Sequence, residues 1–304
     1  MAGRLWRFFL FAFHNPQVIQ RSTIQLLRFP FSYFLMPVFW FALSFVNDIN
    51  WLRAVLAFLL IHVLLYPSSN GYNSFMDRDT ESIGGIEKPM QPTKQLFYVT
   101  VIMDVMGMLL SFFISWQFAA GFAFYIICSR MYSYRKIRLK RFAIPGYLVV
   151  ILNQGALIFA MVYHAASQNL SMKIPLQGMI AAAFLIGGFY PITQIYQHKS
   201  DADDGVQTIS MKLGKKGTFI FCALMYGIAF SILFVYYKQE NKLLDFFVLQ
   251  IFFIIVIIYF LQWMLKVWKN EMFADFKHTM RMNVFASTCT NFAFITLILM
   301  QQLG

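Results

Sequence analysis

Four oxygen-bearing side chains follow one another at helical spacing between residues 70 and 81. Asn70, Asn73, Asp77 and Glu81 are three or four residues apart, so they share one face if this stretch is a helix. Hard divalent cations such as Mg²⁺ take oxygen ligands, and one or two carboxylates often hold them together with substrate phosphates. The strip therefore predicts a metal that carries a phosphorylated substrate. The alternative is a helix end whose polar residues only face water.

A second polar cluster lies between residues 190 and 210. Gln194, Gln197 (or His198) and Asp201 repeat the helical spacing, and Asp203 follows. If the two clusters face the same side of the protein, they can close together on one metal-bound diphosphate.

The composition shows what positions these clusters. The 304 residues are 59% hydrophobic and 12% charged, which is more apolar surface than a soluble core can hide. The chain is therefore predicted to be an all-α, polytopic membrane protein. Its three cysteines, Cys128, Cys222 and Cys289, stand singly in apolar segments and indicate neither a disulfide framework nor a metal site.

A bilayer crossing needs about 20 apolar residues. By this measure we predict a nine-helix transmembrane bundle. The spans lie near 31–47, 52–69, 96–114, 117–129, 143–164, 176–192, 217–236, 243–265 and 282–300.

The basic residues orient these spans. With the N-terminus inside, 21 Lys and Arg residues fall in cytoplasmic segments and four, Arg53, Lys173, Lys238 and Lys242, fall outside. This bias predicts a cytoplasmic N-terminus and an attraction to anionic membrane lipids, and it accounts for the net charge of +12 without nucleic acid. Both polar clusters then end on the cytoplasmic side. We expect an integral protein of a bacterial cytoplasmic membrane, with its active site facing the cytoplasm.

The N-terminal segment, residues 1–30, is predicted to be cytoplasmic or interfacial. Its apolar stretch from Leu5 to Phe13 is too short to span and is typical of a helix that lies in the membrane interface. Residues 31–304 are expected to form a single transmembrane domain.

The two clusters together resemble the motifs of the UbiA superfamily of intramembrane prenyltransferases, and the resemblance covers nearly the whole chain. The family's Asn-x3-Asp-x3-Asp motif matches Asn73, Asp77 and Glu81, with Glu in place of the last Asp. In a second register, the family's Tyr-Asp-x3-Asp matches Tyr72, Asn73 and Asp77, and Asp79 supplies a carboxylate.

Three further matches support the resemblance. In the second motif, Gln197 stands where the first Asp of the family's Asp-x3-Asp is found, and Asp201 is the second. Lys88-Pro89 is similar to the family's Arg-Pro, and Tyr132 with Lys136 is similar to its Tyr-x3-Lys.

The resemblance implies a nine-helix fold and a Mg²⁺-dependent enzyme. Such an enzyme ionises an isoprenyl diphosphate and transfers the prenyl group to a lipophilic, commonly aromatic acceptor, as in quinone or isoprenoid-lipid biosynthesis. It also implies Asp77 and Asp201 as the central metal ligands and catalytic carboxylates. The supporting metal ligands would be Asn73, Glu81, Gln197 and Asp203.

The substrate-binding residues expected from this reading include four basic side chains that clamp the diphosphate. The full set is Lys88, Arg130, Tyr132, Lys136, Lys199 and Asn70. Each basic residue also counts toward the charge bias, so it is equally open to a purely topological role. Intramembrane Asn153, Gln154 and Asn291 can either face a cavity or join helices by hydrogen bonds.

Two other functions remain open from the sequence. A membrane terpene cyclase uses the same scaffold but captures the cation with the chain's own double bond. A transporter or non-catalytic binder is disfavoured, because the carboxylates lie at one membrane face and no matching repeat halves with broken helices are visible.

Overall fold

The computed structural model describes residues 19–303, and the regular secondary structure of this part of the chain is helical. Its only β-type pairings are two isolated bridges, between Ile49 and Ser167 and between Ile83 and Ile86. The all-α prediction is confirmed. The predicted interfacial helix at Leu5–Phe13 lies outside the described residues.

Nine long helical segments follow one another within residues 19–303, and several of them are built from shorter pieces. They are α2, η1 and α3 (Arg21–Leu26, Phe29–Phe31, Ser32–Leu43), α4, η2 and α5 (Trp51–Leu59, Leu60–Leu65, Tyr66–Asp77), α6 (Lys94–Ser111), α7 (Trp116–Ser133), α8, η4 and α9 (Ala143–Val150, Ile151–Leu157, Ile158–Ala166), α10 (Leu176–Thr193), α12 (Ile209–Gln239), α13 (Leu243–Lys269) and α14 (Phe276–Leu303). Short helical turns occur at η3 (Leu139–Arg141), α11 (His198–Asp203) and η5 (Glu271–Phe273).

Eight of these segments are long and apolar enough to cross a membrane. The remaining predicted span, 117–129, forms helix α7, whose polar residues, Gln117 and Arg130 among them, lower its hydropathy. The number of nine crossings and the cytoplasmic N-terminus stay predictions. The first helical segment begins at Arg21 and not near residue 31 as expected, because α2 and η1 precede α3. Helix α2 ends at Leu26, and the left-handed Arg28 comes directly before η1.

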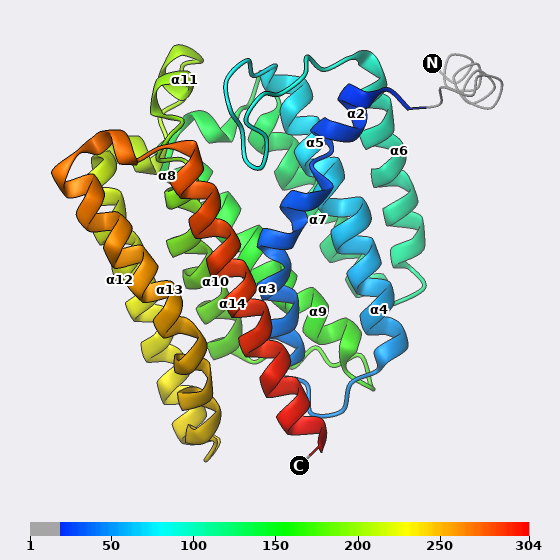
Figure 1. Ribbon diagram of the computed structural model, residues 1–304. Coiled ribbons are helices and arrows are strands. Elements are labelled where there is room, and N and C mark those ends of the chain that lie inside the picture. The colour runs from blue at the N-terminus through cyan, green and yellow to red at the C-terminus, as the bar shows by residue number, and fades with distance from the viewer. Residues whose placement is uncertain (1–18, 304) are drawn as a thin grey trace.

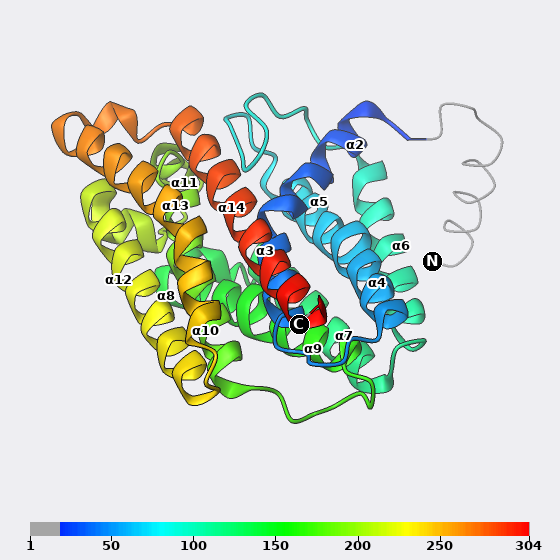
Figure 2. The ribbon, with the colours of Figure 1, turned by 60° about the horizontal axis from the view of Figure 1, so that its bottom comes forward.

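The bundle has one end that carries both polar clusters. Figure 1 shows the end of α5 and the short α11 at the same end of the molecule, with the C-terminus at the opposite end. In Figure 2, α12 and α13 form one side of the bundle, and α4, α5 and α6 form the other. The expectation that the two clusters lie at one end is confirmed.

Two π-helical stretches interrupt the long helices. Leu60–Leu65 precedes α5, and Ile151–Leu157 lies between α8 and α9. At the second stretch, Gly155 lies so close to α10 that an added Cβ would be 2.6 Å from the Ala183 Cα. A π-helical turn adds one residue and often marks a functional site, because it redirects the side chains beside it.

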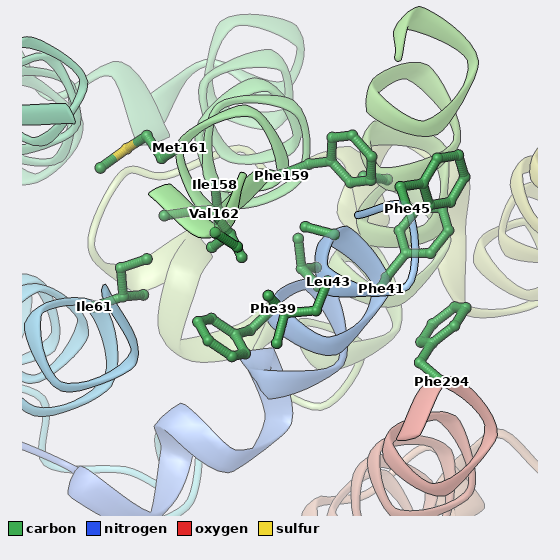
Figure 3. Close-up of a cluster of buried hydrophobic side chains, with 14 of the residues drawn as sticks. Phe39, Phe41, Leu43, Phe45, Ile61, Ile158, Phe159, Met161, Val162 and Phe294 are labelled. Atoms are coloured by element: carbon green, nitrogen blue, oxygen red, sulfur yellow. The ribbon is translucent and has the colours of Figure 1, made fainter. Parts of the chain in front are cut away.

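Aromatic rings hold the centre of the bundle together. Phe41 of α3 lies 5.2 Å from the ring of Phe159 and 4.7 Å from that of Phe294, so one ring joins α3, α9 and α14 (Figure 3). On the outside, α13 exposes Ile251 and Ile254, as a lipid-facing helix does. Lipid tails are as apolar as these side chains, so close van der Waals packing is the main force in such a core.

Candidate active site

Helix α5 ends at Asp77, where the first cluster was expected to continue. Arg78 takes a left-handed conformation (φ 56°, ψ 41°), and its N–H donates to the carbonyl of Ser74 at 3.1 Å. Such a residue ends a helix. The prediction of one helix through Glu81 is therefore wrong, and the side chain of Glu81 is exposed to solvent.

The chain turns back immediately after Arg78. A tight turn pairs Ile83 with Ile86 through two backbone hydrogen bonds of 2.9 Å. In this arrangement Asp79 lines the same cavity as Asp77, as the second register of the motif implied.

The second cluster is also broken into pieces. Helix α10 ends at Thr193, and α11 begins at His198, so Gln194, Gln197 and Asp201 do not lie on one continuous helix as their spacing suggested. All three nevertheless line the cavity that contains Asp77.

We name this space the carboxylate cavity; its volume is about 140 Å³. Three aspartates line it, together with two basic residues, several amide and hydroxyl groups, and apolar side chains. Its lining is Arg28, Phe31, Leu35, Asn73, Asp77, Asp79, Ile83, Gly84, Tyr132, Lys140, Gln154, Phe189, Tyr190, Thr193, Gln194, Gln197, Asp201, Val206 and Thr208.

Asp77 is a buried carboxylate held by basic and amide groups. Its side chain is 3% exposed, and its Oδ2 accepts hydrogen bonds from Lys140 Nζ and, at 2.9 Å, from Asn73 Nδ2. Arg138 Nη2 lies 3.7 Å from Oδ1, but this oxygen has no hydrogen-bond partner. A buried oxygen left in this state is a suitable ligand for a hard cation.

The basic groups near Asp79 and Asp201 do not offset the burial of these two carboxylates, so both have raised pKa values. Burial is the main cause of a pKa of about 7 for Asp201; the charge of Lys140 opposes this rise, and the charges of Asp79 and Asp77 add to it. Burial and the charge of Asp77 likewise raise the pKa of Asp79. A bound divalent cation would favour the ionised form of both groups.

The ligand types fit Mg²⁺, although no cluster of acids forms a cage for it. Within residues 19–303, no three His, Cys, Asp or Glu side chains are grouped closely enough to hold a metal ion. A metal here would be bound by one or two aspartates, with neutral oxygens from Asn73 or Gln197. Mg²⁺ is commonly held in this way.

Several predicted site residues lie away from the carboxylate cavity. Lys88, Lys136, Lys199 and Asp203 have exposed side chains and, like Glu81, do not line it. They lie in loops or on the outer face of α11, where solvent can hydrate their charge.

Arg130 is paired inside the helix bundle and does not point into the carboxylate cavity. Its guanidinium forms an ion pair with Asp104 of α6, with Nε 3.0 Å from Oδ2, and lies 3.9 Å from the ring centre of Tyr72. Its Nη2 also donates to Ser68 at 3.2 Å. Arg130 therefore joins α7 to α5 and α6.

Two basic residues that the sequence suggested only as topology signals do line the carboxylate cavity. They are Lys140, which pairs with Asp77, and Arg28, whose Nη2 lies 3.3 Å from the Asn70 carbonyl and 3.5 Å from Asn73 Oδ1. Within residues 19–303, Arg28 has no ion-pair partner, and its Nε has no hydrogen-bond partner. Since Arg28 comes before the predicted first span, no spacing pattern linked it to the motifs.

Asp204 links the end of α11 to the loop after α7 beside this cavity. It accepts hydrogen bonds from Arg138 and, at 2.7 Å, from Arg135, which both follow α7. These bonds fix α11, and with it Asp201, against the loop that carries Lys140.

The remaining predicted residues lie beside the carboxylate cavity. The hydroxyl of Tyr132 lies 2.5 Å from that of Tyr190, and both rings line the cavity. Asn70 and Asn153 line an adjoining space, whereas Gln154 lines both spaces. Asn291 of α14 is buried and lines neither.

The chain is similar to a known protein family and to several solved structures. The profile described as the UbiA prenyltransferase family matches residues 34–285, and no curated protein matches. A UbiA homologue from Archaeoglobus fulgidus bound to DMAPP and Mg²⁺ superposes with a TM-score of 0.62 at 15% identity, covering 91% of this chain and 99% of that one.

Two more solved structures have the same fold. The apo UbiA homologue from Aeropyrum pernix K1 has a TM-score of 0.63 at 14% identity, covering 88% of this chain and 98% of that one. A structure described for digeranylgeranylglyceryl phosphate synthase has a TM-score of 0.59 at 16% identity, covering 92% and 97%. At these identities the likeness shows the fold alone.

Proposed function

The chain belongs to the UbiA prenyltransferase family, and we propose that it ionises an isoprenyl diphosphate and transfers the prenyl group to a lipophilic acceptor within the membrane. The observation that carries this proposal is the carboxylate cavity, where Asp77, Asp79 and Asp201 meet Arg28 and Lys140. A site for a metal-bound diphosphate needs two kinds of group: carboxylates that hold the metal ion, and basic side chains that donate to the phosphate oxygens.

The metal in this proposal is Mg²⁺, held by one or two of Asp77, Asp79 and Asp201 with neutral oxygens from Asn73 or Gln197. A related structure from Archaeoglobus fulgidus contains Mg²⁺ with DMAPP, and another contains it with GPP. When bound, Mg²⁺ neutralises the charge that develops on a departing diphosphate.

The chain's own residues would complete the site. Arg28 brings a guanidinium with an unused Nε–H to the cavity, and Lys140 brings an ammonium that bonds one oxygen of Asp77. Both can donate to phosphate oxygens. The rings of Tyr132, Tyr190 and Phe189 line the same space, where aromatic faces stabilise an allylic cation and limit the access of water.

A separate apolar cavity has a lining that suits a short part of an isoprenyl tail. It has a volume of about 50 Å³ and lies between α3, α10, α12, α13 and α14, with Phe34, Phe41 and Phe294 in its wall. Phe189 lines both this apolar cavity and the carboxylate cavity. A diphosphate in the carboxylate cavity could therefore extend its tail past Phe189 among apolar side chains.

The proposed setting is a bacterial cytoplasmic membrane, with residues 31–304 acting as a single domain and the carboxylate cavity facing the cytoplasm. The charge bias of 21 basic residues against four supports this orientation.

The direct test is release of diphosphate from geranyl diphosphate by the purified protein in lipid nanodiscs, with and without Mg²⁺. Asp77→Ala and Asp201→Ala should each abolish turnover and leave the protein folded. Asp203→Ala is the matched control and should have a mild effect, because its side chain is exposed. Full activity in Asp77→Ala or Asp201→Ala would show that the residue is not a metal ligand. A cyclised product formed without an acceptor would show that the enzyme is a terpene cyclase and not a prenyltransferase.

A further inference from the structure

A cleft opens on the surface of the bundle where α14 begins, at the end that carries both polar clusters (Figure 1). Its volume is about 570 Å³, and it lies between α14 and the loop that follows α5. Three charged side chains, Glu87, Lys277 and Arg281, line it together with four apolar side chains of α14. None of these residues lines the carboxylate cavity or the apolar cavity, so this space, which we name the α14 cleft, is a separate one.

The three charged side chains of the α14 cleft are not paired with one another. Lys277 and Arg281 are one helical turn apart on α14, and Glu87 reaches the cleft from the loop. All three side chains are exposed, and none of them forms an ion pair within residues 19–303. Two positive charges and one negative charge are therefore open to a ligand.

The loop that carries Glu87 is held by α2. The side-chain amide of Gln25 donates to the Lys88 carbonyl at 3.3 Å, and its Oε1 accepts from the Met90 N–H at 2.8 Å. These two bonds hold the backbone directly after Glu87. The carboxylate is therefore kept beside α14 even though it has no ion-pair partner of its own.

An exposed apolar face continues from the α14 cleft along the helix. Phe285 lies one turn beyond Arg281, lines the cleft and is 45% exposed. Phe292 and Leu299 follow at intervals of seven residues, which is about two turns, and are 58% and 54% exposed. These side chains share one face of a segment that is long and apolar enough to cross a membrane. A lipid chain lying on this face would keep its head group at the charged cleft.

The signs of the three charges match a phosphoethanolamine head group. Its phosphodiester oxygens can accept from Lys277 and Arg281, and its primary ammonium can donate to the carboxylate of Glu87. Phosphocholine has no N–H to donate, and phosphoglycerol has no positive charge to place beside Glu87. The general attraction of a basic surface to membranes follows net charge, so it favours anionic lipids instead.

From these observations we propose that the α14 cleft binds a membrane phospholipid with an ethanolamine head group. The phosphate lies at Lys277 and Arg281, the ammonium lies at Glu87, and one acyl chain follows the exposed apolar face of α14. The loop that carries Glu87 also supplies Ile83 and Gly84 to the wall of the carboxylate cavity. The lipid would therefore join α14 to a loop of the proposed active site.

The test is a lipid titration of the delipidated protein in detergent, with the Kd of the first bound lipid measured by native mass spectrometry. The probes are phosphatidylethanolamine, phosphatidylcholine and phosphatidylglycerol with identical palmitoyl and oleoyl chains, so that they differ in the head group alone. The variants are Glu87→Gln and the double variant Lys277→Met with Arg281→Met. Lys269→Met is the matched control, because Lys269 is an exposed basic residue at the end of α13 and does not line the cleft.

The wild-type protein should bind phosphatidylethanolamine about threefold more tightly than either other lipid, the size expected for one exposed charged contact. Glu87→Gln should raise the Kd of phosphatidylethanolamine to that of phosphatidylcholine and leave the latter unchanged. The double variant should weaken the binding of all three lipids by about fivefold, since each has a phosphate. Lys269→Met should change none of the three values. If the double variant is not recovered folded, Arg281→Met is measured in its place.

Tighter binding of phosphatidylglycerol than of phosphatidylethanolamine by the wild-type protein would overturn the proposal, because net charge alone would then select the lipid. Equal binding of the ethanolamine and choline lipids would overturn it as well, and so would a preference that survives Glu87→Gln. A loss of binding in Lys269→Met equal to that in the double variant would show that the α14 cleft is not the binding site.

Discussion

The ion pair between Lys140 and Asp77 should stabilise the fold measurably when no metal is present. The side chains are 11% and 3% exposed, so Lys140→Met would leave a buried carboxylate without its closest counter-charge. Breaking a buried pair in this way costs about 3–5 kcal/mol. Asp77 keeps the amide of Asn73 at 2.9 Å and the guanidinium of Arg138 at 3.7 Å, which reduces the expected loss to about 2 kcal/mol.

Thermal unfolding in detergent without divalent cations is the assay. For a chain of this size, about 2 kcal/mol corresponds to a fall in Tm of roughly 4 °C. Lys136→Met is the matched control, since Lys136 is exposed in the same loop and its loss should leave Tm unchanged. Replacing both partners, Asp77→Asn with Lys140→Met, should recover most of the loss, because no buried charge is then left without a partner.

Addition of Mg²⁺ should raise the Tm of Lys140→Met more than that of the wild-type protein, because the ammonium no longer occupies Asp77 Oδ2. The reasoning is refuted if Lys140→Met unfolds at the same temperature as Lys136→Met. A fall in Tm that Mg²⁺ does not reverse would support the stabilising role of the ion pair but would show that Asp77 is not a metal ligand.

Three further predictions concern the motif, the topology and the response to pH. Asp79→Asn should weaken Mg²⁺-dependent binding of geranyl thiodiphosphate by about tenfold or more, and Glu81→Gln should have less than a twofold effect. Isothermal calorimetry measures both affinities, and the reverse result would support the register in which Glu81 is the metal ligand. A cysteine at Lys136 should react with an impermeant thiol reagent only from the cytoplasmic side, and one at Asn169 only from outside; the opposite labelling at Lys136 would reject the orientation. Burial raises the pKa of Asp201 from 3.8 to about 7. Without divalent cations, the folded state therefore holds this proton more tightly than the unfolded state. The free energy of unfolding should then fall as pH rises from about 4 through about 7. Asp201→Asn should flatten this part of the stability profile, and a profile identical to that of the wild-type protein would contradict the assignment.

The fold class and the meeting of the two polar clusters could be predicted from the sequence. Apolar runs of membrane length are a strong signal, and their parity placed Asp77 and Asp201 at one end of the bundle. The structure puts both residues in one cavity.

The course of the chain after Asp77 could not be predicted in the same way. Glu81 has the correct helical spacing, but Arg78 adopts a left-handed conformation, which is uncommon for a residue other than glycine. Local spacing gives no information on such a conformation, so spacing alone favours Glu81 over Asp79.

The basic residues were the least predictable part of the site. Lys and Arg in cytoplasmic loops all contribute alike to the charge bias, and their partners are distant in sequence. Arg130 pairs with Asp104 of α6, whereas Arg28, 45 residues before Asn73, faces the cavity. Only three-dimensional packing separates a structural arginine from one that can meet a ligand.

The π-helical stretch Leu60–Leu65 holds more residues per turn than the α-helix Tyr66–Asp77 that follows it. Deleting one residue within Leu60–Leu65 would restore regular α-helical geometry and keep Asn73 and Asp77 on the same face, because the wide turn absorbs the extra residue. Deleting one residue between Tyr66 and Asn73 would instead rotate Asn73 and Asp77 by about 100° about the helix axis, away from the cavity, although neither had been substituted. One-codon deletions should therefore be tolerated better in the π-helical stretch than in the α-helical turns that follow it.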